Sequence, residues 1–128
     1  MCICNDRRWP ETFRVMGLKG VEIVLLGYNT LDTNVYHPEP VDRRMFHHRL
    51  SLQAGTYQNG TWVVASAKAG QEDGYGSAVV APTGEIVAQA LTEGDEIVVT
   101  DEDSGRASHH RRPLDYPGRC AERQGFSA

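Results

Sequence analysis

The sequence predicts an α/β (α+β) domain in which helices pack on a sheet. Two short apolar runs rich in β-branched residues, 21–26 and 61–67, are typical of buried strands. They are separated by the longer stretch 43–58, in which apolar residues recur at helical spacing. This order of strand, helix and strand implies a right-handed crossover between parallel strands. Two further apolar runs, 77–81 and 86–90, flank a proline and glycine turn, so we expect the sheet to continue as an antiparallel meander.

The first nineteen residues predict a strand, a sharp turn and a helix. Met1 to Ile3 is apolar, Cys4 follows, and polar or charged residues lead to Pro10, which favours a first helical turn. We expect this helix to end near Lys19, beside two glycines. A cysteine at such a corner is exposed beside the positive end of a helix. Dipole and backbone N–H groups favour a thiolate there and can hold an oxyanion.

The run 21–26 is apolar with one exception and too short for a typical helix, so it predicts a strand buried on both faces. Tyr28, Asn29 and Thr30 follow it directly. Residues at such a strand end commonly line a site in α/β proteins. Residues 31–42 contain prolines, Asn and Asp without periodicity, and we expect them to form an exposed loop.

The stretch 43–58 predicts the longest helix, which should end at Asn59-Gly60. We expect its apolar stripe to lie on the sheet. The stripe comprises Phe46, Leu50, Gln53 or Ala54, and Tyr57.

The last part of the chain divides into a final strand and a tail. A turn at residues 93–95 leads into the apolar run 96–100, which predicts one more strand of the meander. From 101 to 128 no apolar period is sustained, so we expect a loosely ordered tail unless a partner holds it. The chain is therefore divided into a domain over 1–100 and a divergent tail over 101–128.

The composition is typical of one globular domain and excludes several classes of protein. Hydrophobic residues make up 40% and charged residues 23% of the 128 positions. The net charge of -4 gives no reason to expect nucleic acid or a membrane surface as a partner. No apolar run is long enough to span a bilayer, and charged residues interrupt the first twenty positions. With only three cysteines, we expect a cytoplasmic protein.

Cys4 is the candidate nucleophile. A single cysteine is more often a small buried hydrophobe, and it is the corner position that favours catalysis here. Cys2 is expected to belong to the core, with no metal bound by the Cys-x-Cys pair. His47 and His48 are adjacent on the long helix and point about 100° apart, which disfavours a shared metal. One of the two could face the site, although a structural role is favoured for each. We expect no metal and no other cofactor.

Arg7 and Arg8 are candidates for binding a substrate carboxylate. Cations at a helix N-terminus oppose its dipole, so the pair is best explained by an anion, which Arg binds in bidentate fashion. The alternative is a solvated first turn. Asn29 and Thr30 could add neutral donors to the same carboxylate, or could form an ordinary strand-ending turn.

Three segments together resemble a known family. The segment ICNDRRWPETFRVMGLKGVEIVLLGYNT, followed by FHHRLSLQAGTYQNGTWVVASAKAG and VAPTGEIVAQA, closely resembles the nitrilase (carbon-nitrogen hydrolase) superfamily, and within it the N-carbamoyl-D-amino-acid hydrolases. The likeness runs through about the first hundred residues. It implies a four-layer α-β-β-α sandwich, of which this chain would form the C-terminal half, and a triad of Glu, Lys and Cys.

The resemblance also implies roles for residues of this chain. Cys4 would be the nucleophile, the backbone N–H of Asn5 would lie at the oxyanion hole, and His47 matches a histidine near the site. The family's carboxylate-binding positions are matched by Arg7, Arg8, Asn29 and Thr30. In the implied reaction the thiolate attacks the carbamoyl carbon and ammonia leaves. Water then hydrolyses the carbamoyl-enzyme to carbon dioxide and the free amino acid. Glutamate would act as general base, and lysine would stabilise the tetrahedral intermediate.

The chain departs from this family at its beginning. The family's glutamate and lysine precede the cysteine, whereas three residues precede Cys4, so we expect negligible turnover by these 128 residues alone. Met1 matches an internal position, which indicates a truncated or mis-started gene, or a fragment. A half-sandwich leaves a sheet face and a strand edge uncovered, so we expect a homo-oligomer or association with a missing N-terminal half. The alternatives are another nitrilase-branch amidase and a non-catalytic assembly module.

Overall fold

The computed structural model describes residues 1–29, 40–68, 76–92 and 94–101, except for the side chains of residues 41 and 44. Its elements are β1 (Cys2–Ile3), the 3-10 helix η1 (Cys4–Arg8), α1 (Pro10–Leu18), β2 (Ile23–Tyr28), α2 (Val41–Asn59), β3 (Trp62–Ala67), β4 (Ala78–Val80) and β5 (Ile86–Gln89). The predicted helices and the strands of the predicted hairpin are confirmed. Prediction and structure differ at several element boundaries by one or two residues.

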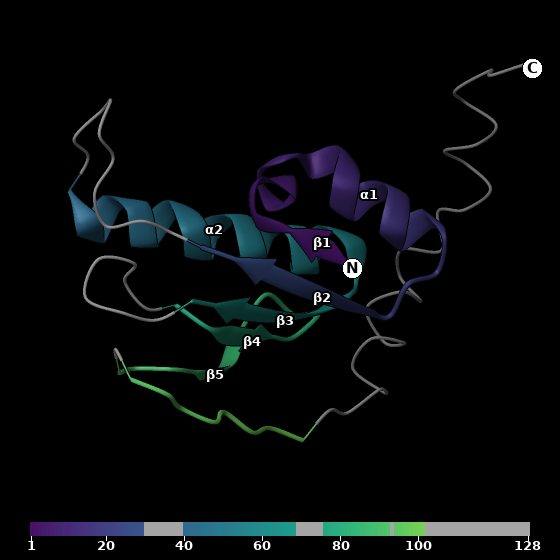
Figure 1. Ribbon diagram of the computed structural model, residues 1–128. Coiled ribbons are helices and arrows are strands. Elements are labelled where there is room, and N and C mark those ends of the chain that lie inside the picture. Colours follow the sequence, from purple (N-terminus) through teal and green to yellow (C-terminus); the bar gives the residue numbers. More distant parts are fainter. Residues whose placement is uncertain (30–39, 69–75, 93, 102–128) are drawn as a thin grey trace, which may run out of the picture.

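The strands form one sheet in the order β1-β2-β3-β4-β5. β1 pairs with β2, and β2 with β3, in parallel, whereas β4 pairs antiparallel with both β3 and β5. Figure 1 shows α1 and α2 on the same side of this sheet. The predicted α/β order with an antiparallel continuation is confirmed.

The core lies between the sheet and its two helices. Phe13 of α1 and Leu52 of α2 are almost fully buried there. They pack on alternate strand residues that face the helices, namely Cys2, Val24, Leu26, Tyr28, Val63, Ala65 and Val80.

The prediction that the strand at 21–26 is buried on both faces is wrong. β2 begins at Ile23, and its residues alternate between exposed and buried along its whole length. Leu25 is 54% exposed, whereas its neighbour Leu26 is 2% exposed. The reason is that the helices of the described chain cover one face of the sheet, which leaves the side chains of the other face exposed.

The apolar stripe predicted for α2 is also wrong. Phe46, Leu50 and Tyr57 are each more than half exposed. The buried side of the helix carries His48 and Thr56 along with Leu52 and Gly55. A small residue is required at Gly55, since an added Cβ would lie 2.7 Å from Cδ2 of Phe13. Close approach of α1 and α2 therefore decides which side of α2 faces inward.

The ends of α2 and of the hairpin follow their turn residues. Gly60 caps α2 in the left-handed conformation with a φ of 60°, as its position after Asn59 predicts. Gly84 has a φ of 83° in the turn between β4 and β5.

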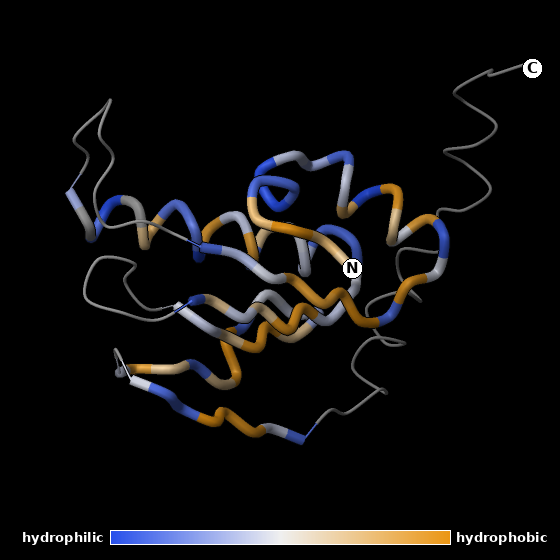
Figure 2. The backbone as a smooth tube through the Cα atoms, in the orientation of Figure 1, coloured by the Kyte–Doolittle hydropathy of each residue, from blue (hydrophilic) through white to orange (hydrophobic). Residues whose placement is uncertain are grey.

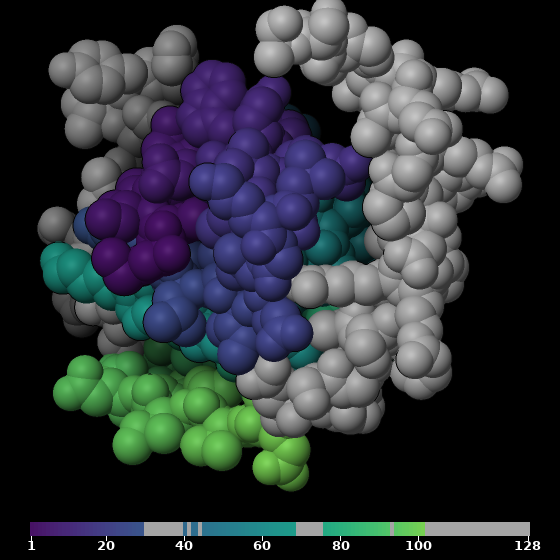
Figure 3. Space-filling view, turned by 90° about the vertical axis from the view of Figure 1, so that its right-hand side faces the viewer, coloured from purple at the N-terminus to yellow at the C-terminus, as the bar shows by residue number. Residues whose placement is uncertain are grey.

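The predicted strand at 96–100 is not formed. Within the described part of the chain no strand pairs with these residues, and a strand needs a hydrogen-bonded neighbour. Ile97 is 91% and Val99 is 81% exposed. Figure 2 shows this apolar stretch in the lowest trace, and Figure 3 shows it on the side of the molecule opposite η1 and α1.

Other expectations fall partly outside the described residues. Residues 31–39 of the predicted loop and residues 102–128 of the predicted tail lie there, and α2 already begins at Val41. Among the helices of the described ranges, none combines the length and the apolar character needed to cross a membrane.

Candidate active site

Cys4 forms a strained corner between β1 and η1. Its φ of 48° is left-handed, and no other non-glycine residue of the described chain has a positive φ. This conformation costs an L-residue about 1–2 kcal/mol. Two hydrogen bonds brace the corner: the Ile3 N–H donates to Oδ2 of Asp6 at 3.0 Å, and Nη1 of Arg7 donates to the Cys4 carbonyl at 2.6 Å.

The strand register brings this corner beside the end of β2. Ile3, the last residue of β1, pairs with Gly27, so Cys4 and Asn29 both follow at the same edge of the sheet. The Sγ of Cys4 lies 3.9 Å from the carbonyl oxygen of Asn29, within reach of a weak thiol contact. Lys68 follows β3 at this edge, and its N–H donates to the carbonyl of Tyr28 at 3.1 Å. The carboxyl ends of parallel strands are where open α/β sheets bind ligands.

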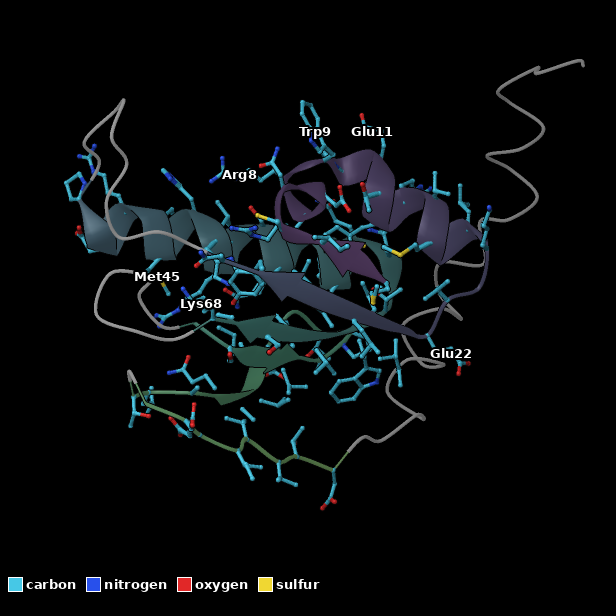
Figure 4. The ribbon with its side chains drawn as sticks, viewed as in Figure 1. Arg8, Trp9, Glu11, Glu22, Met45 and Lys68 are labelled. Carbon is cyan, nitrogen blue, oxygen red and sulfur yellow. The ribbon has the colours of Figure 1, made fainter. Side chains whose placement is uncertain are left out.

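The two arginines after the corner have different surroundings. Arg7 is 5% exposed, and its guanidinium carbon lies 4.8 Å from the centroid of the Tyr28 ring. Burial, and then the charge of Arg8, lower the pKa of Arg7. Arg8 is exposed, and Figure 4 shows it projecting away from the sheet beside α2. The guanidinium of Arg7 therefore holds the corner from inside, while Arg8 is open to a ligand.

Tyr28 and His48 continue the buried cluster from Arg7. Their ring centroids are 4.4 Å apart with an interplanar angle of 41°, and the Tyr28 hydroxyl donates to the carbonyl of Gly76 at 2.5 Å. Burial raises the pKa of Tyr28. Burial, followed by the charge of Arg7, lowers the pKa of His48 to about 4, so this imidazole is neutral at pH 7. His47 is exposed, and its ring centroid lies 5.6 Å from that of Phe46.

The sequence places Tyr28 at the strand end and offers both histidines, but it does not show that Tyr28 and His48 are in contact. The only signal for Tyr28 is its position after an apolar strand. The buried histidine could not be told from its neighbour by periodicity, because the apolar stripe of α2 points to the wrong side.

The other residues singled out in the sequence are Asn5, Thr30 and Cys2. Asn5 is exposed in the first turn of η1, where a backbone N–H has no intrahelical acceptor. Thr30 lies outside the described residues. Cys2 is buried in the core, and burial raises the pKa of its thiol. In the ranges that the structure describes, no three His, Cys, Asp or Glu residues come together in a way that could hold a metal.

A polar cavity of about 340 Å³ opens at the carboxyl end of β3. Its lining includes Ser66, Lys68, Ser77 and Glu96. The Thr92 hydroxyl and the N–H groups of residues 91 and 92 donate to the Glu96 carboxylate and lower its pKa. Since β3 is two strands from β1, this cavity is roughly 10 Å along the edge from the Cys4 corner. The edge thus combines a thiol at a strained corner, an exposed guanidinium and a cavity for polar groups.

Known proteins of similar sequence and fold identify the family of the chain. The model of the carbon-nitrogen hydrolase family matches residues 1–112. Among solved structures, a carbon-nitrogen hydrolase from Helicobacter pylori G27 is 26% identical with a TM-score of 0.73, over 89% of this chain and 43% of its own. Nit3 of Saccharomyces cerevisiae, a member of branch 10 of the nitrilase superfamily, is 26% identical with a TM-score of 0.69, over 91% of this chain and 41% of its own.

The NitFhit protein of C. elegans is 27% identical with a TM-score of 0.68, over 91% of this chain and 28% of its own. The chain thus spans less than half the length of each of these structures. Because the family model matches most of the 128 residues and the fold agrees with these structures, the chain belongs to the carbon-nitrogen hydrolase family.

Proposed function

We propose that this chain supplies the nucleophile and the carboxylate contacts of an enzyme that hydrolyses N-carbamoyl-D-amino acids. The observation that carries the proposal is the corner at Cys4, where a thiol follows a parallel strand in a left-handed conformation with the Arg7 guanidinium behind it. Membership of the carbon-nitrogen hydrolase family supports cleavage of a carbon–nitrogen bond. The carbamoyl substrate rests on the resemblance of residues 3–30 to the N-carbamoyl-D-amino-acid hydrolases.

The proposed reaction proceeds in two stages at Cys4. The thiolate attacks the carbamoyl carbon, and the C–N bond to the terminal amino group breaks to release ammonia. The backbone N–H of Asn5 donates to the oxyanion of the tetrahedral intermediate. Water then cleaves the thioester-like bond, which frees the thiol and a carbamic acid that decomposes to carbon dioxide and the amino acid. A glutamate would be the general base and a lysine would stabilise charge, as the resemblance implies.

The substrate carboxylate would be bound outside the corner. Arg8 is the exposed guanidinium of the pair, so we assign it the direct contact. Asn29 is exposed at the neighbouring strand end and adds a neutral donor, and Thr30 follows it in the sequence. Arg7 contributes its charge from the buried side. His47, exposed on α2, is assigned a peripheral contact to the substrate.

Ammonia release tests the proposal. The 128-residue chain alone should release negligible ammonia from N-carbamoyl-D-alanine, because neither the general base nor the lysine matches any of its residues. Mixing it with a separately made N-terminal half of a carbon-nitrogen hydrolase domain should restore release, and Cys4→Ala should abolish it. Restored release that survives Cys4→Ala would overturn the role of Cys4. Robust turnover by the chain alone would overturn the need for a second half.

A related amidase is the second candidate, and the burial of Arg7 favours it. With Arg7 directed to the Cys4 carbonyl and the Tyr28 ring, Arg8 is the exposed guanidinium of the expected pair. In the reconstituted enzyme, Arg8→Ala should raise KM for N-carbamoyl-D-alanine at least tenfold and leave KM for propionamide unchanged, since a charged hydrogen bond is worth about 1.5–3 kcal/mol. Equal effects on both substrates would favour the amidase.

The open face of the sheet supports a partner. Ile3, Leu25 and Val64 are exposed on the face opposite the helices, by 62%, 54% and 38%. Exposed apolar faces of this kind are typical of interaction surfaces. We propose that this face is covered by the other half of the domain, or by another copy in a homo-oligomer, and light scattering of the chain with and without an added N-terminal half distinguishes the two.

A further inference from the structure

Three buried side chains lead from α2 to the Cys4 corner. His48 on α2 is 3% exposed, Tyr28 at the end of β2 is 7% exposed, and Arg7 in η1 is 5% exposed. The His48 ring lies 4.4 Å from the Tyr28 ring, and the Arg7 guanidinium carbon lies 4.8 Å from the Tyr28 centroid. Tyr28 thus contacts an imidazole on one element and a guanidinium on another.

Arg7, the last of these three residues, is hydrogen-bonded to the backbone of the Cys4 corner. Nη1 of Arg7 donates to the Cys4 carbonyl at 2.6 Å. That carbonyl belongs to the residue with the left-handed φ of 48°, whose side chain carries the thiol. A shift of the guanidinium would therefore release a constraint on the strained backbone that presents Sγ.

The imidazole is suited to its place because it is uncharged. Arg7, Arg8 and Arg49 are the charged groups that act on His48, and all three are cations. A protonated ring would place a second positive charge beside the buried guanidinium of Arg7, where charges are poorly screened. A neutral aromatic ring, in contrast, packs on Tyr28 without repelling the guanidinium of Arg7, which contacts the same tyrosine.

We propose that His48 is a positioning residue: its neutral ring fixes Tyr28, Tyr28 fixes the guanidinium of Arg7, and Arg7 fixes the Cys4 corner in its reactive geometry. This inference rests on the proposed role of Cys4 and extends it to a residue on α2 that does not touch the thiol.

The reactivity of the thiol tests the inference on the full 128-residue chain. The Cys4 thiolate attacks the methylene carbon of iodoacetamide, which forms a C–S bond and releases iodide. Peptide mass spectrometry separates this product from alkylated Cys2 and Cys120. Rates are measured from pH 5 to 9. His48→Ala removes the ring and should slow alkylation of Cys4 about twofold to thirtyfold at pH 7 and displace the rate profile to higher pH. This range corresponds to the coupling of about 0.5–2 kcal/mol carried by residues that act through a packed series.

Two further variants separate positioning from stability. His48→Phe keeps a neutral ring against Tyr28 and should retain the wild-type rate and profile. Leu52→Val removes one buried methylene-sized group from the same side of α2, which should lower the unfolding midpoint without moving the profile.

Three results would contradict the positioning role of His48. If His48→Ala leaves the rate and the profile unchanged, or Leu52→Val changes them equally, His48 has no positioning role. If the wild-type Cys4 is no more reactive than a cysteine in an unfolded peptide, the corner does not activate the thiol and the positioning role fails. The proposed function is tested separately, by ammonia release from the reconstituted enzyme.

Discussion

The backbone of Cys4 is held in a conformation that glycine adopts freely and cysteine adopts at a cost. With a φ of 48° the Cβ lies close to the following carbonyl. The strain is retained because the Arg7 and Asp6 hydrogen bonds on either side restrain the turn. Conformational strain is therefore stored in the residue that carries the candidate thiol.

The cost of the left-handed conformation at Cys4 should be measurable as a difference in unfolding free energy between two variants. Cys4→Gly should be about 1 kcal/mol more stable than Cys4→Ala, because glycine has no Cβ to strain at a positive φ. Urea unfolding followed by circular dichroism gives the difference. At Ile3, which is extended with a φ of -130°, the order should reverse, with alanine more stable than glycine. The same order at both positions would mean that the corner is unstrained.

His48 should make the stability of the chain depend on pH. Its pKa is about 4 in the fold and near 6.5 when unfolded, so between these values the unfolded chain binds a proton that the folded chain does not. The stabilisation that depends on a neutral His48 is therefore complete above pH 6.5. It is lost as the pH falls toward 4, which lowers the free energy of unfolding by up to about 3 kcal/mol. Urea unfolding at pH 7, 5.5 and 4.5 measures it. His48→Phe should remove this part of the slope, and an equal slope in both proteins would contradict the assignment.

Gly55 sets the spacing between α1 and α2, and the apolar stripes of the two helices do not. An added Cβ at Gly55 would lie 2.7 Å from the Phe13 ring, so the helices are close enough to exclude a methyl group. This contact turns His48 and Thr56 inward and leaves Phe46 and Leu50 exposed. Helix packing thus overrides the periodicity of the helix sequence.

Gly55→Ala should therefore destabilise the chain by about 1–3 kcal/mol, despite the higher helix propensity of alanine, because overpacking forces the helices apart. Thermal unfolding measures the effect. Gly27→Ala is the matched control, since its Cβ would meet no heavy atom within 4 Å, and it should be neutral or slightly stabilising. A neutral Gly55→Ala would show that the two helices separate at little cost.

For the molecule as a whole, the sheet has one covered and one open face. The open face carries Leu25 at 54% exposure, and Ile97 and Val99 are exposed beyond the last paired strand. The chain spans less than half the length of each solved structure that it resembles. The exposed apolar side chains support the proposal that a partner covers this face.

Association of the chain should respond to the open face alone. Leu25→Lys should lower the average mass measured by light scattering and change the free energy of unfolding little, because the side chain is already half exposed. Leu26→Lys, its buried neighbour at 2% exposure, should prevent folding instead. Unchanged association in folded Leu25→Lys would exclude this face as the interface.

Much of the fold follows from local signals. The turn from β1 into η1, the start of α1 at Pro10 and the end of α2 at Gly60 depend on residues within a few positions of each other. The parallel order of β1, β2 and β3 follows from the strand and helix patterns. Because these features are local or topological, the sequence by itself determined the corner and the edge of the sheet at which it lies.

Only the tertiary structure decided which side chains face inward. His48 rather than His47 is buried, and Arg7 rather than Arg8 supports the corner, because contacts with segments twenty or more residues away set these orientations. Among the described residues, the apolar run 96–100 has no strand paired with it for the same reason, since a strand depends on a neighbour that its own residues do not specify. Burial is a property of the assembled layers, whereas periodicity is a property of one segment.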